Sequence, residues 1–196
     1  MTNKNNTPEV ASTAQLEREL KRVDFNSRYM KVLRSTVFTL IITAAISVLV
    51  VSLILPVIQI YGTSMTPTVY EGDIVVAVKE SKYEQGEVVG LYYANRVLVK
   101  RIIAREFDTV DLDENGNFTV NGELLDEPYI STKDYGDATN IEFPYQVPEG
   151  TYFVVGDNRK DSVDSRSTTI GCISKDDIVG KLFFTVWPFK HFGKIE

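Results

Sequence analysis

The feature that most constrains this chain is its longest uncharged stretch, Ser35–Tyr70, which contains no Lys, Arg, Asp or Glu. Its densest apolar part is Val37–Ile60, which as a helix would measure roughly 36 Å at about 1.5 Å per residue. That length crosses a hydrocarbon core of roughly 30 Å with some tilt. A buried helix of a soluble protein would normally keep a polar face, and this segment has none. We therefore expect one transmembrane helix over residues 37–60.

Charge differs on the two sides of this segment. Residues 1–36 hold seven Lys/Arg and four Asp/Glu, a net charge of +3. Because the formal net charge of the whole chain is −6, the remaining residues carry −9. Arg28, Lys31 and Arg34 directly precede the apolar run, which predicts a cytoplasmic segment over residues 1–36 and an extracytoplasmic domain over residues 61–196. We expect a single-pass protein of the cell membrane, in contact with the lipid bilayer. The acidic remainder argues against nucleic acid as a partner.

After residue 60 the pattern is typical of strands and turns. Six segments are rich in β-branched and aromatic residues: 73–78, 88–92, 97–104, 109–112, 117–120 and 151–155. Asn115-Gly116 and Asn121-Gly122 are hairpin turn signals, and residues 125–150 read as a long connection. The sequence predicts a mainly β fold, an antiparallel sandwich or irregular barrel.

The most polar segment of this domain follows one of the predicted strands. Gly156–Arg166 carries three carboxylates, three cations, an amide and two hydroxyls, directly after the apolar run Tyr152–Val155. Solubility does not require that density of mixed groups at the end of a buried strand. It suits a site in which side chains hold one another through charge-assisted hydrogen bonds.

A serine and a lysine supply candidate chemistry. A serine hydroxyl needs a base, and the one histidine, His191, lies in the C-terminal tail, where a surface position is expected. Lysine serves as a base when burial lowers its pKa. Lys100 shares a strand face with Leu98 and Ile102. Alone, Lys100 also fits an edge-strand lysine and Ser64 a polar linker, whereas together with the polar block they favour a serine/lysine hydrolase.

Four motifs in this order resemble the type I signal peptidases of peptidase family S26, in particular the Gram-positive bacterial branch. They are Ser64-Met65-x-Pro67-Thr68, Gly72–Val76, Lys100-Arg101 and the block Gly156–Arg166. The resemblance implies a serine endopeptidase with the signal-peptidase fold. It implies nucleophile Ser64, base Lys100, a hydroxyl of Ser162 that orients the base, and the supporting pairs Asp157 with Arg101 and Asp164 with Arg166.

The resemblance also implies a substrate and its binding site. Signal-peptide-bearing preproteins would be cut after small residues of the Ala-x-Ala type, close to the secretion translocon. The turn residues Gly62 and Thr63 would shape the oxyanion site, although some relatives have a serine donor where this chain has Gly62. An extended substrate would add as a strand between residues 58–61 and 96–99. The expected contacts are Ile58, Ile60, Tyr61, Met65 and Leu98.

The composition and the three candidate active-site residues also bear on cofactors and on other functions. With one cysteine and one histidine we expect no metal and no other cofactor. A self-cleaving repressor-type protease shares the Ser/Lys logic, but the apolar span and the missing DNA-binding domain argue against it. The alternative from another class is a membrane-anchored, non-catalytic binding or assembly module. The presence of Ser64, Lys100 and Ser162 together argues against that module.

Overall fold

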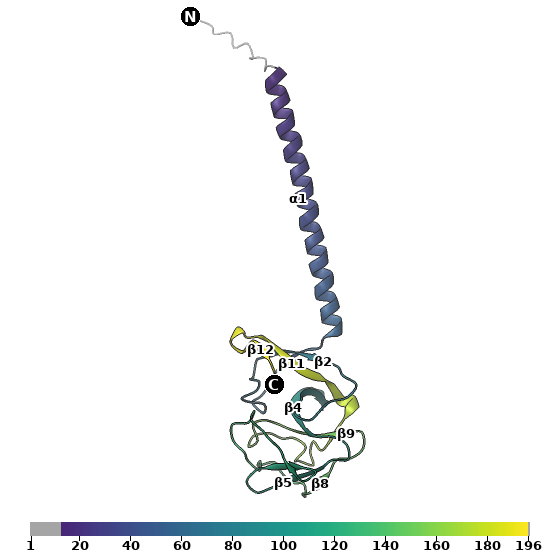
Figure 1. Cartoon of the computed structure of the whole chain (residues 1–196), viewed down its shortest axis with the longest axis vertical. Coiled ribbons are helices and arrows are strands. Elements are labelled where there is room, and N and C mark those ends of the chain that lie inside the picture. The colour runs from purple at the N-terminus through teal and green to yellow at the C-terminus, as the bar shows by residue number, and fades with distance from the viewer. Residues whose placement is uncertain (1–12, 196) are drawn as a thin grey trace, which may run out of the picture. The chain divides into compact units, whose positions relative to one another are not determined.

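The structure is a computed structural model that describes residues 13–195. It divides between Val51 and Ser52 into two compact units, one containing most of a long helix and the other built from strands (Figure 1). The predicted cytoplasmic segment begins with residues 1–12, which lie outside the described residues. Each unit is described by itself.

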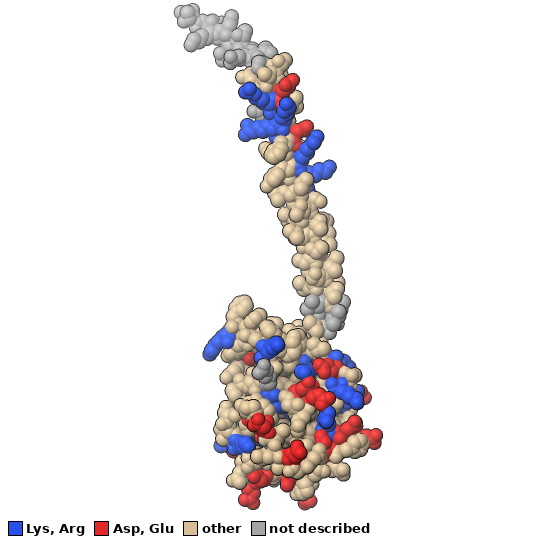
Figure 2. Space-filling view, in the orientation of Figure 1, with Lys and Arg blue, Asp and Glu red and all other residues tan. Residues whose placement is uncertain are grey.

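Helix α1 runs from Thr13 to Ile54, and its stretch Thr13–Val50 is long and apolar enough to cross a membrane. Lys and Arg side chains gather on its first half, and an uncharged stretch follows (Figure 2). The predicted end of the helix at Ile60 is wrong. The helix stops two residues before Pro56, because the residue before a proline is disfavoured in the helical conformation. Residues 57–59 form a strand instead.

Four hydroxyl side chains along the apolar part of α1 are satisfied by the helix itself. The hydroxyls of Thr36, Thr39, Thr43 and Ser47 each donate to the carbonyl four residues earlier, at 2.9–3.0 Å. These side chains therefore need no partner from water or protein.

The second unit contains two antiparallel sheets, which confirms the mainly β prediction. The larger sheet has the order β1-β2-β11-β3-β4-β9-β10, with β12 paired to β11. The smaller sheet has the order β7-β6-β5-β8. The strands of the larger sheet are β1 (Val57–Gln59), β2 (Ile74–Val78), β3 (Val88–Tyr93), β4 (Arg96–Ala104), β9 (Thr151–Val155), β10 (Ile173–Ser174), β11 (Ile178–Trp187) and β12 (Gly193–Lys194). Those of the smaller sheet are β5 (Thr109–Leu112), β6 (Phe118–Val120), β7 (Glu123–Leu124) and β8 (Tyr145–Gln146); the short 3-10 helices are η1 (Lys175–Asp177) and η2 (Phe189–His191).

The six predicted strands are all present, within one or two residues at their ends. Both predicted hairpins also form: β5 pairs with β6 and β6 with β7, through turns in which Gly116, Asn121 and Gly122 have positive φ. The longest strand outside the six predicted segments is β11, which lies between β2 and β3 in the larger sheet.

Strand β4 is the element that fixes the site, because it crosses the middle of the domain. It pairs with β3 on one side and, beyond Lys100, with β9 on the other. Val99–Ala104 are all buried. Ile102 belongs to one hydrophobic cluster, while Ile103 packs with Phe118 and Phe153 in another that joins the two sheets. Burial of each apolar side chain of this size stabilises the fold by about 1.5–3 kcal/mol. A shift in the register of β4 would therefore be strongly destabilising.

Candidate active site

Ser64 lies on a turn that is closed by backbone hydrogen bonds at its base. Ile60 N–H donates to the Asp73 carbonyl at 2.8 Å, and Gly72 N–H donates to the Ile60 carbonyl at 2.9 Å. Gly62 has φ of +81°, a conformation that other residues rarely adopt. Met65 is 2 % exposed and anchors the turn in the core, which leaves Ser64 half-buried at the surface of the domain.

Lys100 reaches this serine from β4. Its Nζ donates a hydrogen bond to Ser64 Oγ at 2.7 Å, and the residue is 3 % exposed. Burial lowers the pKa of Lys100 to about 8; the Asp164 carboxylate acts in the opposite direction, and the Arg166 guanidinium lowers the pKa further. A buried lysine with this pKa is partly neutral near pH 7, so it can accept a proton.

The block that follows β9 packs directly on the nucleophile turn. Asn158 N–H donates to the Ser64 carbonyl at 3.0 Å, and Asn158 Nδ2 donates to the Thr63 carbonyl at 3.3 Å. Gly156 allows this approach: a Cβ there would lie 2.5 Å from Ser64 O and 2.3 Å from Ser162 Oγ. Residue 156 therefore has to be a glycine for the two segments to meet as they do.

The structure brings together Arg101 and Asp157, the first expected supporting pair. Two hydrogen bonds of 2.9 Å and 2.8 Å join the guanidinium to the carboxylate, and both side chains are buried. Thr68 Oγ1 donates to Asp157 Oδ2 at 2.5 Å, and Arg101 Nη1 donates to the Gly86 carbonyl at 2.6 Å. The pair thereby links the nucleophile turn to β4.

Asp164 and Arg166, the second expected pair, also meet. Arg166 Nε and Nη2 each donate to the Asp164 carboxylate at 2.9 Å, and Gly156 N–H donates to the same carboxylate at 3.0 Å. Burial alone would raise the pKa of Asp164, but the hydrogen bonds and charge of Arg166 outweigh it, so the pKa is lowered. The carboxylate stays ionised, and its negative charge favours the ammonium form of Lys100.

Ser162 does not make the predicted contact with Lys100. Its Oγ is buried without a hydrogen bond to Lys100, and it lies close enough to the Asp164 carboxylate to help lower the pKa of that group. The hydroxyl lies beside Gly156 instead, where the block turns towards Ser64. The role expected for Ser162 therefore has no hydrogen bond to carry it in this structure.

A third buried ion pair was not predicted from the sequence. Arg159 and Glu127 are joined at 2.5 Å with fully buried side chains. Nearby, the Tyr129 ring centroid lies 3.8 Å from Arg101 Cζ. The density of charge in the block was a signal for Arg159, whereas nothing local to residues 125–150 marks Glu127 as buried.

An apolar groove of about 780 Å³ runs beside the nucleophile turn. Its lining residues are Pro56–Gln59, Tyr61, Gly62, Tyr92, Asn95–Leu98 and Val179. Of the expected substrate contacts, Ile58, Tyr61 and Leu98 line this groove. Ile60 and Met65 do not; they lie in the hydrophobic core, to which Ile58 also belongs.

The two sides of the groove carry strand edges. Among the described strands, β1 pairs only with β2, and residues 96–99 of β4 pair only with β3. An extended peptide has space and backbone partners there.

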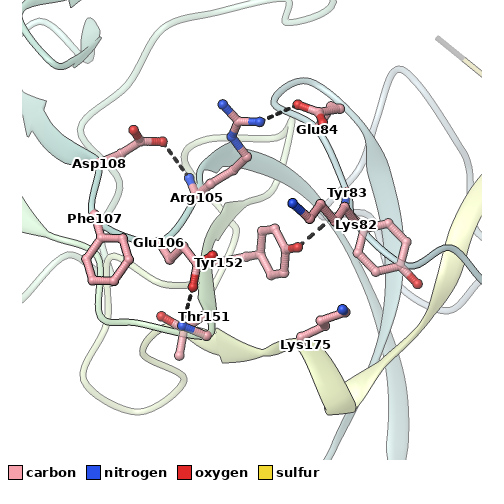
Figure 3. Close-up of a pocket in the computed structure, with 11 residues that line it drawn as sticks. Lys82, Tyr83, Glu84, Arg105, Glu106, Phe107, Asp108, Thr151, Tyr152 and Lys175 are labelled. Atoms are coloured by element: carbon pink, nitrogen blue, oxygen red, sulfur yellow. Dashed lines mark hydrogen bonds and ion pairs between the residues drawn. The ribbon is translucent and has the colours of Figure 1, made fainter.

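Another cleft, of about 310 Å³, lies away from these residues and holds none of the expected ones (Figure 3). Several of its polar groups bond to one another: Arg105 pairs with Glu84 at 2.5 Å, and Tyr152 Oη accepts from Tyr83 N–H at 3.4 Å. It contains no candidate nucleophile.

His191 lies half-buried at the surface, where it makes contacts that the sequence did not predict. Its Nδ1 lies 2.8 Å from Asp73 Oδ1, its ring stacks on Tyr70 at 4.5 Å, and its side chain is 25 % exposed. It braces the base of the nucleophile turn through Asp73 and Tyr70.

Most of this chain is similar in sequence to known proteins. Residues 32–187 match the family described as "Signal peptidase, peptidase S26". Signal peptidase I of Bacillus amyloliquefaciens is 33 % identical over 167 residues, which cover 80 % of this chain and 89 % of that protein. Signal peptidase IB of Staphylococcus aureus is 37 % identical over 153 residues, covering 68 % and 78 %. A signal peptidase I structure from Enterococcus faecalis is 26 % identical, with a TM-score of 0.43, covering 52 % of this chain and 97 % of its own. The family match and the two sequence relatives show that this chain belongs to the S26 signal peptidase family of serine endopeptidases.

Proposed function

We propose that this protein is a membrane-anchored serine endopeptidase that removes signal peptides from secreted preproteins with a Ser64/Lys100 dyad. The observation that carries the proposal is the 2.7 Å contact between Lys100 Nζ and Ser64 Oγ, with the lysine buried and its pKa lowered to about 8. A lysine kept for charge or solubility would lie in water, and its pKa would stay close to 10.4.

The reaction follows from this pair. Neutral Lys100 takes the Ser64 hydroxyl proton as Oγ attacks the scissile carbonyl, and the ammonium then gives that proton to the leaving amine. The signal peptide is left as an ester on Ser64. Lys100 next takes a proton from water, which attacks the ester, and returns it to Ser64 as the acid product leaves. Backbone N–H groups of the Gly62–Ser64 turn would stabilise the oxyanion, since residue 62 has no side-chain donor.

The groove supports a peptide substrate. An extended segment ending at the scissile bond would lie between β1 and residues 96–99 of β4, with hydrogen bonds to both strand edges. The cut after small residues of the Ala-x-Ala type is proposed from the resemblance, and Ile58 and Leu98 would form apolar walls beside them.

Membrane anchoring is proposed from α1. Its apolar stretch would span the bilayer once, with Arg28, Lys31 and Arg34 on the cytoplasmic side and the β unit outside. Preproteins held in the same membrane by their signal peptides, near the translocon, would then meet the site at high effective concentration.

The test uses the full-length protein in detergent with an Ala-x-Ala preprotein. Ser64→Ala and Lys100→Ala should each leave less than a hundredth of wild-type cleavage while both proteins stay folded. Lys82→Ala, which removes an exposed lysine on the cleft of Figure 3, is the matched control and should cleave normally. Activity above a tenth of wild type in either dyad variant refutes the assignment, and a wild type that cleaves no preprotein favours the non-catalytic binding or assembly module.

A further inference from the structure

Three buried arginine–carboxylate pairs involve the strand and the block that hold the dyad. Arg101 pairs with Asp157, Arg166 with Asp164, and Arg159 with Glu127. Asp157 and Asp164 belong to the block that follows β9, whereas Glu127 comes from the long connection between β7 and β8. An unpaired buried charge is strongly destabilising, so the third pair depends on this distant segment.

Arg159 transmits the contact from Glu127 to the nucleophile turn. Its Nη2 lies 2.5 Å from Glu127 Oε1, and its Nε donates to the Gly156 carbonyl at 3.1 Å. The Arg159 carbonyl accepts from Arg166 Nη2 at 2.8 Å. Between Gly156 and Arg159 lies Asn158, whose N–H holds the Ser64 carbonyl. The Glu127 carboxylate thus fixes the short segment that in turn holds Ser64.

A second contact from the same connection reaches Arg101, the residue next to the base. The Tyr129 ring lies 3.8 Å from Arg101 Cζ, a cation–π geometry, and Arg101 follows Lys100 directly on β4. Tyr129 Oη donates to Glu127 Oε1 at 3.3 Å. Burial raises the pKa of Tyr129, so this hydroxyl keeps the proton that it donates. Glu127 therefore contacts the block that holds Ser64, through Arg159, and Tyr129 contacts Arg101 on the strand that carries Lys100.

We propose that Glu127 is a positioning residue of the peptidase reaction: through Arg159 it holds residues 156–158 against Ser64 and balances a buried cation of the dyad's charge cluster. The inference rests on the proposed Ser64/Lys100 function. Glu127 touches neither substrate nor dyad, so its effect passes through Arg159 and the block.

The charge balance gives the proposal a signature that a merely structural role lacks. The Asp164 and Asp157 carboxylates favour the Lys100 ammonium, the Arg166 guanidinium disfavours it, and Ser64 accepts its hydrogen bond. Loss of the Glu127 charge leaves the Arg159 cation uncompensated in the same buried cluster. An additional positive charge disfavours the ammonium, so the pKa of Lys100 should fall.

The experiment measures kcat, KM and the pH dependence of kcat/KM for full-length Glu127→Gln in detergent. Expected are a kcat lower by roughly 10- to 100-fold, the loss typical of a misplaced reacting group, a KM within about twofold, and an ascending limb moved to lower pH. The matched control Glu84→Gln removes an exposed carboxylate, 62 % exposed and paired with Arg105, and should leave all three unchanged.

A double variant keeps the test decisive if Glu127→Gln folds poorly. Glu127→Leu with Arg159→Met removes both buried charges, which such sites tolerate. It should fold, return the ascending limb to its wild-type pH and keep the low kcat. Wild-type kcat with an unmoved limb in either variant overturns the proposal, as does a loss that only tracks the folded fraction. Ser64→Ala, measured alongside, separates this failure from failure of the dyad itself.

Discussion

Replacing Lys100 by methionine should abolish cleavage and yet stabilise the fold. Burial lowers the pKa of Lys100 from 10.5 to about 8, and each pKa unit corresponds to about 1.4 kcal/mol, so near pH 7 the buried ammonium costs about 3 kcal/mol. Methionine fills a similar volume without charge, but it leaves Ser64 Oγ without its hydrogen bond, a loss of about 1 kcal/mol. The net gain is about 2 kcal/mol, or roughly 4–8 °C in Tm for a domain of this size.

The gain should depend on pH with a definite sign. Between pH of about 8 and 10.5 the unfolded chain binds more protons at Lys100 than the folded chain, so wild-type stability rises with pH across this window. Lys100→Met lacks that rise. Its advantage is therefore largest at or below pH 8 and disappears as pH approaches 10.5.

The assay is thermal unfolding of the full-length protein in detergent at pH 7 and pH 10. The chain has one tryptophan, Trp187 on β11, so intrinsic tryptophan fluorescence reports the β unit and not α1. Lys181→Met is the control with the opposite sign, because the Glu87 hydrogen bond raises the pKa of Lys181. A Lys100→Met protein that melts at or below the wild-type temperature at pH 7 refutes the reasoning that burial, and not an uncounted partner, sets this lysine's pKa.

Two further predictions concern rate and topology. The ascending limb of kcat/KM should report Lys100 near pH 8. Ile102→Thr should move this limb to higher pH, because a polar group on the same face of β4 lowers the desolvation cost of the ammonium and so raises the pKa of Lys100. An unmoved limb shows that Ile102 does not shield Lys100. Protease added to spheroplasts should digest the β unit and spare a tag at residue 2; digestion of the tag means that the orientation is inverted.

The extent to which the sequence predicts the fold depends on whether a pattern is local. The six predicted strands carry β-branched and aromatic residues between clear turns. Strand β11 escaped because Gly180 and Lys181 interrupt its apolar run, although Lys181 is held by Glu87 across the sheet. The helix end was misplaced because Val57–Ile60 is as apolar as the residues before it; only Pro56 marks the change from helix to sheet.

The site follows the same rule. Ser64, Lys100 and the two expected ion pairs belong to short motifs, and the structure brings each pair together. Glu127 could not be found in this way, since an acidic residue in a polar connection is ordinarily solvated, and the partner that compensates its buried charge, Arg159, lies in another segment. Ile58 and Ile60 lie two residues apart in the same hydrophobic cluster, so it is tertiary packing, which the apolar pattern does not reveal, that lets only Ile58 also line the groove.

Gly156 makes the site sensitive to a substitution that changes none of its reactive groups. Where a side chain would begin, the Ser64 carbonyl and the Ser162 hydroxyl already occupy the space. A single added methyl group would act as a wedge: it would force apart the segment that carries the nucleophile and the segment that carries the buried carboxylates, while every chemically active atom remained in the chain. Inactivating variants should therefore include a residue that never meets the substrate, and their mark would be an intact set of functional groups that no longer fit together.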